Sequence, residues 1–69
     1  MQDIEVGYIV EDRTSGFVKI HGRTEEWAIA YAKEVPKATA WRITSWWRNG
    51  EPWNQFEVYN KRTGKWEYR

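Results

Sequence analysis

The clearest alternation of hydrophobic and polar residues lies between Ala38 and Arg69, where two turn signals divide it into three segments. Asn49-Gly50 favours the two-residue turn of a β-hairpin, because a type I′ turn needs positive φ at both central residues. Arg62-Thr63-Gly64 fits a three-residue loop with Gly64 in the left-handed conformation. The pattern therefore predicts three strands, at 38–47, 53–60 and 65–69.

The Asn49-Gly50 turn also fixes which residues face each other across the first hairpin, so each strand has two distinguishable sides. Apart from Ala40, which faces Tyr59, the residues on one side are aromatic, polar or charged: Arg42, Thr44, Trp46, Trp53, Gln55, Glu57 and Tyr59. The residues on the other side are apolar: Trp41, Ile43, Phe56 and Val58. We expect the apolar side to form the core and the aromatic side to stay open. The second hairpin is expected to place Glu57 between Arg42 and Arg69.

The first half of the chain predicts a hairpin followed by a helix. Residues 4–10 alternate with the period of a half-buried strand, residues 12–16 form a turn, and residues 17–21 form a second strand, with Val10 opposite Val18. Thr24 is a suitable N-cap for a helix over 25–34, and Pro36 ends that helix. Its apolar stripe, with Trp27 at its start, would pack on the sheet together with Trp41 and Trp66.

The connections between these elements predict the topology. A helix that crosses back over the sheet makes the third strand antiparallel to the first, which gives the strand order 2-1-3-4-5. The sequence thus predicts a single α+β domain over residues 1–69, with a five-stranded antiparallel sheet and one helix on one face. One helix is about 10 Å wide and cannot cover both sides of a sheet, so one face is expected to remain open.

The composition argues against several functional classes. The chain has no Cys and a single His, and its paired carboxylates are neighbours in the chain, as solvated groups usually are. We therefore expect no catalysis, no metal and no cofactor. A membrane-spanning run and a signal-peptide pattern are both lacking, so we expect a soluble cytoplasmic protein without membrane contact.

The charge distribution permits an anionic partner without requiring one. The net charge is only +1, far from the balance of a dedicated nucleic-acid binder. Residues 1–37 carry seven acidic and five basic side chains, whereas residues 38–69 carry three acidic and six basic ones. The first segment therefore has a charge of −2 and the second of +3, which makes the second the candidate for such a contact.

The aromatic side of the Asn49-Gly50 hairpin is the candidate binding surface. Exposed Trp, Tyr and Arg side chains dominate binding hot spots. The expected anchors are Arg42, Trp46, Trp53 and Tyr59, and the expected charged rim is Arg48, Lys61 and Arg62. Alternatively, the Trp46–Trp53 pair only stabilises the hairpin, by about 0.5 to 1.5 kcal/mol.

The whole chain also resembles small phage-encoded inhibitors, in particular the type I-F anti-CRISPR proteins. The similarity follows the order of a hairpin, a short Ala-rich helix, the strand at Trp41-Arg42-Ile43, the turn at Gly50 and the closing Gly64-Lys65-Trp66. It implies a non-enzymatic protein that docks on a CRISPR surveillance complex through its sheet and basic residues. The many Trp residues and the longer 48–52 connection differ from that family.

Three hypotheses follow. The leading one is a phage or mobile-element binding module that blocks a host protein or nucleoprotein complex with its open sheet face. The second is a small DNA- or RNA-binding domain, in which Trp46 and Trp53 stack on bases while Arg42, Arg48 and Lys61 contact phosphates. In the third, the open face pairs with a second copy to form a homodimer.

Overall fold

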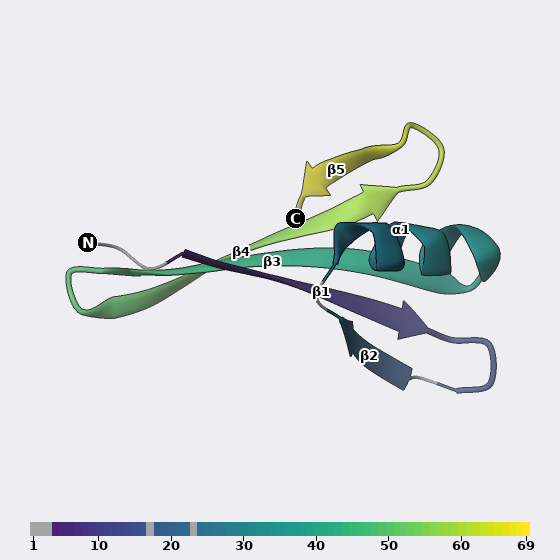
Figure 1. Cartoon of the computed structure of the whole chain (residues 1–69), viewed down its shortest axis with the longest axis horizontal. Helices are drawn as coiled ribbons and strands as arrows, with labels where there is room; N and C mark the ends of the chain where they lie inside the picture. Colours follow the sequence, from purple (N-terminus) through teal and green to yellow (C-terminus); the bar gives the residue numbers. More distant parts are fainter. Residues whose placement is uncertain (1–3, 17, 23) are drawn as a thin grey trace.

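One antiparallel sheet and one helix make up the described part of the chain, and the computed structural model describes residues 4–16, 18–22 and 24–69. The elements are β1 (Ile4–Asp12), β2 (Val18–Gly22), α1 (Glu25–Glu34), β3 (Ala38–Arg48), β4 (Glu51–Asn60) and β5 (Lys65–Tyr68). The strand order is β2-β1-β3-β4-β5 (Figure 1). The predicted α+β fold and strand order are confirmed; Phe17, the expected start of the second strand, lies outside the described residues.

The β3–β4 hairpin forms as its turn signal predicts. Asn49 and Gly50 have φ values of 52° and 78°, the left-handed conformations that a type I′ turn requires. The resulting register places Trp46 opposite Trp53 and aligns residues 41–48 with residues 51–58. The predicted sides of this hairpin are therefore correct.

The β4–β5 register differs from the prediction by one residue, because the loop has four residues, 61–64, instead of three. Asn60 organises this longer loop: its side-chain Oδ1 accepts the backbone N–H groups of Arg62 and Thr63, and its carbonyl accepts the N–H of Gly64. As a result Tyr68, not Arg69, lies opposite Glu57.

The β1–β2 register also differs from the prediction. Val10 lies opposite Ile20, and not opposite Val18. A shift of two residues keeps every side chain on its expected face, since the period of a strand is two. Val18 and Ile20 therefore remain on the same side of the sheet as Val10.

Helix α1 has the predicted bounds, and side chains satisfy both of its ends. The hydroxyl of Thr24 accepts the N–H of Trp27 at 3.2 Å, as an N-cap does. At the other end the ammonium group of Lys61 donates to the carbonyls of Val35 and Pro36 at 3.1 and 3.2 Å. Lys61 thus adds a charged donor to the carbonyls that follow the helix, of which that of Val35 also accepts the backbone N–H of Ala38.

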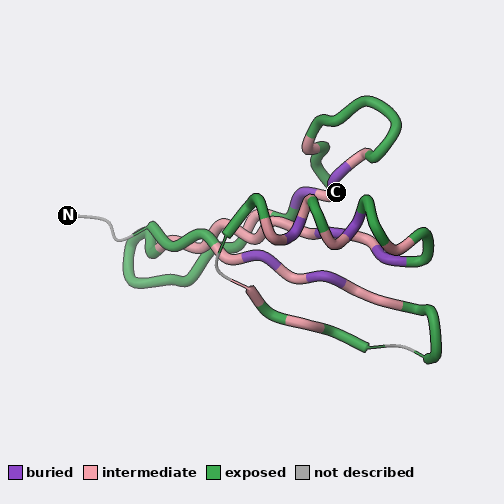
Figure 2. The backbone as a smooth tube through the Cα atoms, turned by 45° about the vertical axis from the view of Figure 1, so that its right-hand side comes forward, coloured by how far each residue is buried: buried purple, intermediate pink, exposed green. Residues whose placement is uncertain are grey.

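The helix packs on the opposite side of the sheet from the one predicted. The residues buried between the helix and the sheet come from α1, β1, β3 and β4: Tyr8, Val10, Ala28, Ala32, Ala38, Ala40 and Tyr59 (Figure 2). On β3 this is the side of Arg42 and Trp46, which was expected to be open. Ala38 and Ala40 explain the choice, because small residues on the sheet let the Ala residues of the helix approach closely.

The helix is too short to cover the whole sheet. A ten-residue helix is about 15 Å long, whereas the eleven-residue strand β3 extends about 36 Å. The outer strands are short as well, since β2 pairs only with residues 8–12 and β5 only with residues 57–60. Three strand segments therefore project beyond the core (Figure 1). We call residues 4–7, 43–48 and 51–56 the Trp arm.

The projection of the Trp arm makes the molecule elongated. Its principal extents are 40 × 25 × 20 Å and its radius of gyration is 13.1 Å. A compact domain of this length has a radius of gyration of about 11 Å. The Trp arm therefore has two sides in contact with solvent, whereas the rest of the sheet has one.

Candidate functional site

The side of the Trp arm that continues the helix-covered face carries a row of apolar side chains. Ile4 lies opposite Trp46 across β1 and β3, and Trp46 lies opposite Trp53 across β3 and β4. Trp46 is half-buried, whereas Ile4 is 64% and Trp53 47% exposed. Val6, on the same side, is also exposed. Four large apolar residues therefore lie on this side of the arm, three of them in one row across the strands.

The opposite side of the Trp arm is also apolar. Trp47 is 57% exposed and lies opposite Pro52, and Phe56 follows four residues further along β4. Consecutive strand residues point to opposite faces, so Trp46 and Trp47 present indole rings on both sides of one thin sheet. A partner that binds the Trp arm on either side therefore contacts an aromatic surface.

The β4 edge of the Trp arm is protected from pairing with another strand by Pro52. A two-residue hairpin closes on a hydrogen-bonded pair, here Arg48 and Glu51, so the next residue of β4 directs its backbone away from β3. Pro52 occupies that position and has no N–H to offer. On β4 the arm therefore presents its side chains for recognition more readily than its edge.

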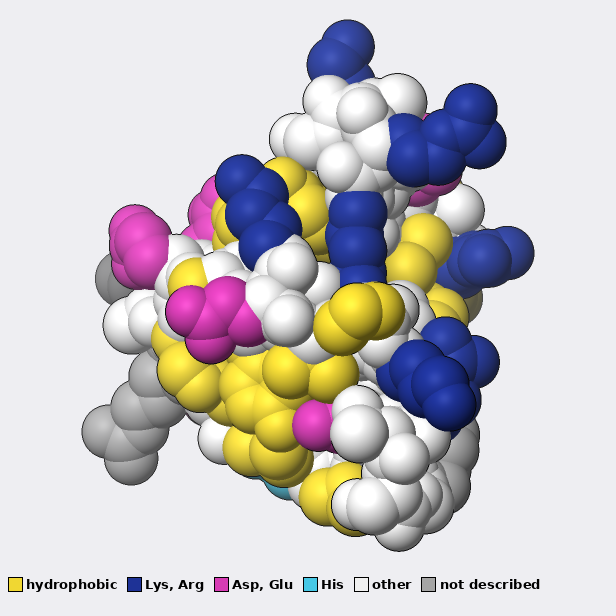
Figure 3. Space-filling view, turned by 90° about the vertical axis from the view of Figure 1, so that its right-hand side faces the viewer, with side chains coloured by type: hydrophobic (Ala, Val, Ile, Leu, Met, Phe, Trp, Pro, Cys, Tyr) yellow, Lys and Arg dark blue, Asp and Glu magenta, His cyan; other side chains and the backbone are white. Residues whose placement is uncertain are grey.

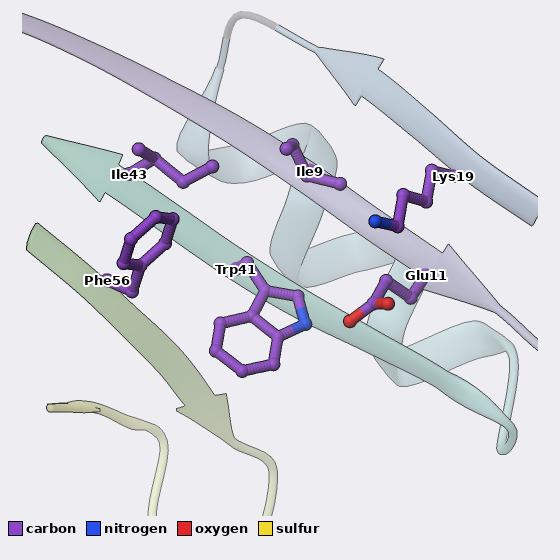
Figure 4. Close-up of a pocket in the computed structure, with 6 residues that line it drawn as sticks. All are labelled: Ile9, Glu11, Lys19, Trp41, Ile43 and Phe56. Carbon is purple, nitrogen blue, oxygen red and sulfur yellow. The ribbon is translucent and has the colours of Figure 1, made fainter. Parts of the chain in front are cut away.

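The helix-free face holds a shallow hollow of about 220 Å³ near the centre of the sheet. Its lining residues come from β1, β2, β3 and β4: Ile9, Glu11, Lys19, Trp41, Ile43 and Phe56 (Figure 4). Trp41 was expected to lie under the helix, and this placement is wrong. Its indole N–H is buried and has no hydrogen-bond partner among the described residues. The hollow continues the apolar surface from Phe56 toward the core end.

Arg42 was expected to be an exposed anchor, but it lies in a structural ion pair beside the core. Its guanidinium donates to both carboxylate oxygens of Glu57, from Nε at 2.9 Å and from Nη2 at 2.8 Å. The Arg42 guanidinium carbon also lies 4.9 Å from the centre of the Trp66 ring. Glu57 is 8% exposed, whereas the side chain of Arg42 is 26% exposed, so the carboxylate is the shielded member of the pair. Arg42 is therefore held within the fold by Glu57 and Trp66.

Tyr59 was likewise expected on an open face, and this placement is wrong. It is 7% exposed and belongs to the core, where its ring lies 5.2 Å from that of Trp66 in an edge-on arrangement. Trp66 and Trp27 pack against the same core, as predicted. A buried tyrosine cannot contact a partner without unfolding its surroundings.

The three predicted rim residues are not brought together. Arg48 lies at the tip of the Trp arm, next to the Asn49-Gly50 turn. Lys61 and Arg62 lie in the β4–β5 turn, at the other end of the sheet, and Lys61 caps the helix. Of the seven predicted site residues, only Trp46, Trp53 and Arg48 share the Trp arm.

The shifted pKa values are explained by hydrogen bonds within the fold. The guanidinium of Arg42 lowers the pKa of Glu57 by hydrogen bonding, against the opposing effect of burial. Hydrogen bonds from Thr14 and Tyr31 lower the pKa of Asp12, and the bond to Asp12 raises that of Tyr31. The Tyr31 hydroxyl donates to Asp12 Oδ2 at 2.8 Å, joining the helix to the end of β1.

Comparison with known proteins finds no relative of this chain. No family model matches the sequence, and no curated protein or solved structure matches it. Within residues 4–16, 18–22 and 24–69, no group of three or more His, Asp or Glu side chains could hold a metal ion. Helix α1, the helix of the described chain, is too short and polar to cross a membrane.

Sequence reasoning missed Ile4, Val6, Trp47 and Phe56 as members of the candidate surface. All four are among the exposed large hydrophobic residues. A signal for them was present: the predicted helix is less than half as long as the predicted third strand, so part of both faces had to stay uncovered.

Proposed function

We propose that this chain is a non-enzymatic binding module that docks on a protein partner through the Trp arm. The observation that carries the proposal is the continuous exposure of large apolar side chains where neither the helix nor an outer strand reaches. Exposed apolar surface of this kind costs solubility and is retained where a partner covers it. Tryptophan supplies the largest contact area of any side chain, which makes Trp53 and Trp47 the expected anchors.

The charges of the Trp arm favour a protein over a nucleic acid at this site. The arm contains two carboxylates, Glu5 and Glu51, and one guanidinium, Arg48. Stacking surfaces for single strands combine aromatic rings with an excess of positive charge. Here that excess is absent, Arg42 is bound to Glu57, and Lys61 lies at the other end of the sheet.

The large accessible surface area of the chain supports the proposal that a partner covers part of it. Its accessible surface is 5402 Å². A monomeric protein of 8.4 kDa has an accessible surface of about 4,600 Å². The difference of about 800 Å² is the area that one partner contributes to a standard protein–protein interface.

The resemblance to phage-encoded inhibitors gives the proposal a specific form, in which the partner is a host CRISPR surveillance complex in the cytoplasm. Expression of the chain in a type I-F CRISPR host should then restore plaque formation by a targeted phage. Trp53→Thr should abolish the rescue. Unchanged plaque counts with the wild-type chain would reject this partner while leaving the Trp arm open to another protein.

The general proposal is tested by comparing variants in a pull-down from host lysate. Trp47→Thr and Trp53→Thr remove the two most exposed rings of the arm while keeping a residue that favours strands. Tyr68→Thr is the matched control, since Tyr68 is 73% exposed but lies on β5 outside the arm. We expect the two arm variants to lose the captured protein and the control to retain it.

Two further measurements make this test decisive. Each arm variant should unfold cooperatively, with a loss of about 1 to 2 kcal/mol, because about half of each ring already contacts water. Light scattering of the wild-type chain should give the monomer mass. A dimer that dissociates in the Trp53→Thr variant would instead show that a second copy occupies the arm.

A further inference from the structure

The end of the sheet opposite the Trp arm is formed by three turns that carry most of the basic side chains. These are the β1–β2 turn, the α1–β3 connection with the last turn of α1, and the β4–β5 turn. The basic residues there are Arg13, Lys33, Lys37, Lys61, Arg62 and Lys65, which we call the basic end. Figure 3 looks onto this end and shows Lys and Arg side chains across its upper and right parts.

Two hydrogen-bonding cations hold these turns against each other. The Arg13 guanidinium donates to the carbonyl of Lys37 at 3.4 Å and to the hydroxyl of Thr39 at 3.3 Å. Lys61 reaches the same connection from the other side, through the carbonyls of Val35 and Pro36. The basic end is therefore built by the fold from segments far apart in the sequence.

The charge of this end is not neutralised within the fold. The six cations are accompanied by two carboxylates, Asp12 and Glu34, so the three turns carry a net charge of +4. The whole chain carries +1, which leaves −3 for the remainder. The side chains of Lys33, Lys37, Arg62 and Lys65 make no ion pair or hydrogen bond with any described residue. The molecule is thus polarised along its length.

We infer that the basic end binds the phosphate backbone of a nucleic acid, independently of the protein contact proposed for the Trp arm. Four of the six cations are lysines on exposed surface, and lysine is depleted at protein–protein interfaces. Contacts to phosphate use lysine and arginine freely and need no pocket. None of the six residues of the basic end is aromatic, so none offers a ring on which a base could stack. The contact is therefore with the backbone and has no base specificity.

The inference predicts strong dependence on salt. If all six cations contact phosphates, the logarithm of the association constant falls with the logarithm of salt concentration, with a slope of about −4 for a single strand and about −5.4 for a duplex. Affinity then drops about 300-fold for the single strand and about 2,000-fold for the duplex between 50 and 200 mM salt. Fluorescence anisotropy with a labelled 20-base-pair DNA duplex and a 20-nucleotide single strand measures this directly.

Substitution of the cations that make no structural contact separates binding from folding. Exchange of Lys33, Lys37, Arg62 and Lys65 for Gln should leave the fold intact and reduce the salt slope by about 3 to 4. The matched pair Arg62→Gln and Arg48→Gln changes the net charge equally at opposite ends of the molecule. We expect weaker binding for Arg62→Gln and unchanged binding for Arg48→Gln.

Three results would overturn the inference. The first is no detectable DNA binding by the wild-type chain at 50 mM salt. The second is an equal loss in the Arg62→Gln and Arg48→Gln variants, which would mean that only total charge matters. The third is binding of a poly-glutamate peptide of equal charge as tightly as DNA, which would identify an acidic protein as the partner.

Discussion

Removal of Arg42 should be among the most destabilising single changes in the molecule. Arg42→Met keeps the length of the side chain but leaves the Glu57 carboxylate shielded and without its cation. At about 4 Å and an effective dielectric constant of 20, the attraction between such charges is about 4 kcal/mol, and desolvation opposes part of it. We expect Arg42→Met to cost about 2 to 4 kcal/mol. That is a large part of the roughly 3 to 10 kcal/mol available to a domain of this size.

Companion variants separate the ion pair from simple loss of packing. Glu57→Gln keeps a hydrogen-bond acceptor for the guanidinium and should cost only about 1 to 2 kcal/mol. The double variant Arg42→Met/Glu57→Leu removes both charges and should lie within about 1 kcal/mol of the wild type. Arg48→Met is the matched control on the same strand, where Arg48 is exposed, and should change stability by less than about 0.5 kcal/mol.

The direction in which stability changes with pH distinguishes loss of the ion pair from loss of packing. In the wild type the folded-state pKa of Glu57 is lowered, so its stabilising contribution is complete at neutral pH and is lost as the pH falls below the unfolded-state value of about 4.5. In Arg42→Met only the effect of burial remains, which raises the pKa of Glu57. Its stability should therefore increase relative to the wild type as the pH falls from 7 to 4.

Urea unfolding followed by Trp fluorescence, at pH 7 and at pH 4, measures both effects. A cost below about 0.5 kcal/mol for both Arg42→Met and Glu57→Gln, with the same pH dependence as the wild type, would refute the structural role of the pair. Loss of partner binding by Arg42→Met at full stability would instead restore Arg42 as an anchor.

Three further changes test the packing and the turns. Ala32→Leu should cost about 1 to 3 kcal/mol in thermal unfolding because Ala32 is fully buried against the sheet, whereas Ala30→Leu on the exposed side of α1 should be nearly neutral; equal effects would contradict close packing of the helix. Gly50→Ala should cost about 1 kcal/mol in urea, since its φ is 78°, and Gly7→Ala, where an added Cβ meets open space, should not destabilise the fold. Tyr31→Phe should make the loss of stability below about pH 4 shallower, because the Tyr31 hydroxyl helps to lower the pKa of Asp12; an unchanged acid titration would show that this bond is not formed.

The features that the sequence predicted correctly depend on local interactions. The Asn49-Gly50 turn fixes the register of the β3–β4 hairpin because the turn and the pairing involve neighbouring residues. Thr24 and Pro36 bracket the helix for the same reason. The strand order follows from chain direction and the handedness of connections.

The features that the sequence did not predict depend on distant pairing. The side that carries the helix is decided when β1 pairs with β3, which places Val10 beside Ala40 across thirty residues of chain. The hydrophobicity of the β3–β4 hairpin alone favoured the other side. The small size of Ala38 and Ala40 was the overlooked signal. The part of a sheet that a helix covers must leave room for the helix as well as being apolar.

The candidate site was predicted in part for the same reason. Trp46 and Trp53 were paired correctly because their pairing is local, and both belong to the Trp arm. Arg42 and Tyr59, further from the turn on the same side, lie in the region that the helix and β5 cover. Position along the strand therefore decides which residues of that side are free to bind.

Site-specific photo-crosslinking in host cells tests the central claim most directly. A photoreactive phenylalanine analogue placed at position 53 should crosslink to one protein partner, and the same group at position 68, which is more exposed but outside the Trp arm, should not. Crosslinking from position 68 and none from position 53 would contradict docking through the Trp arm.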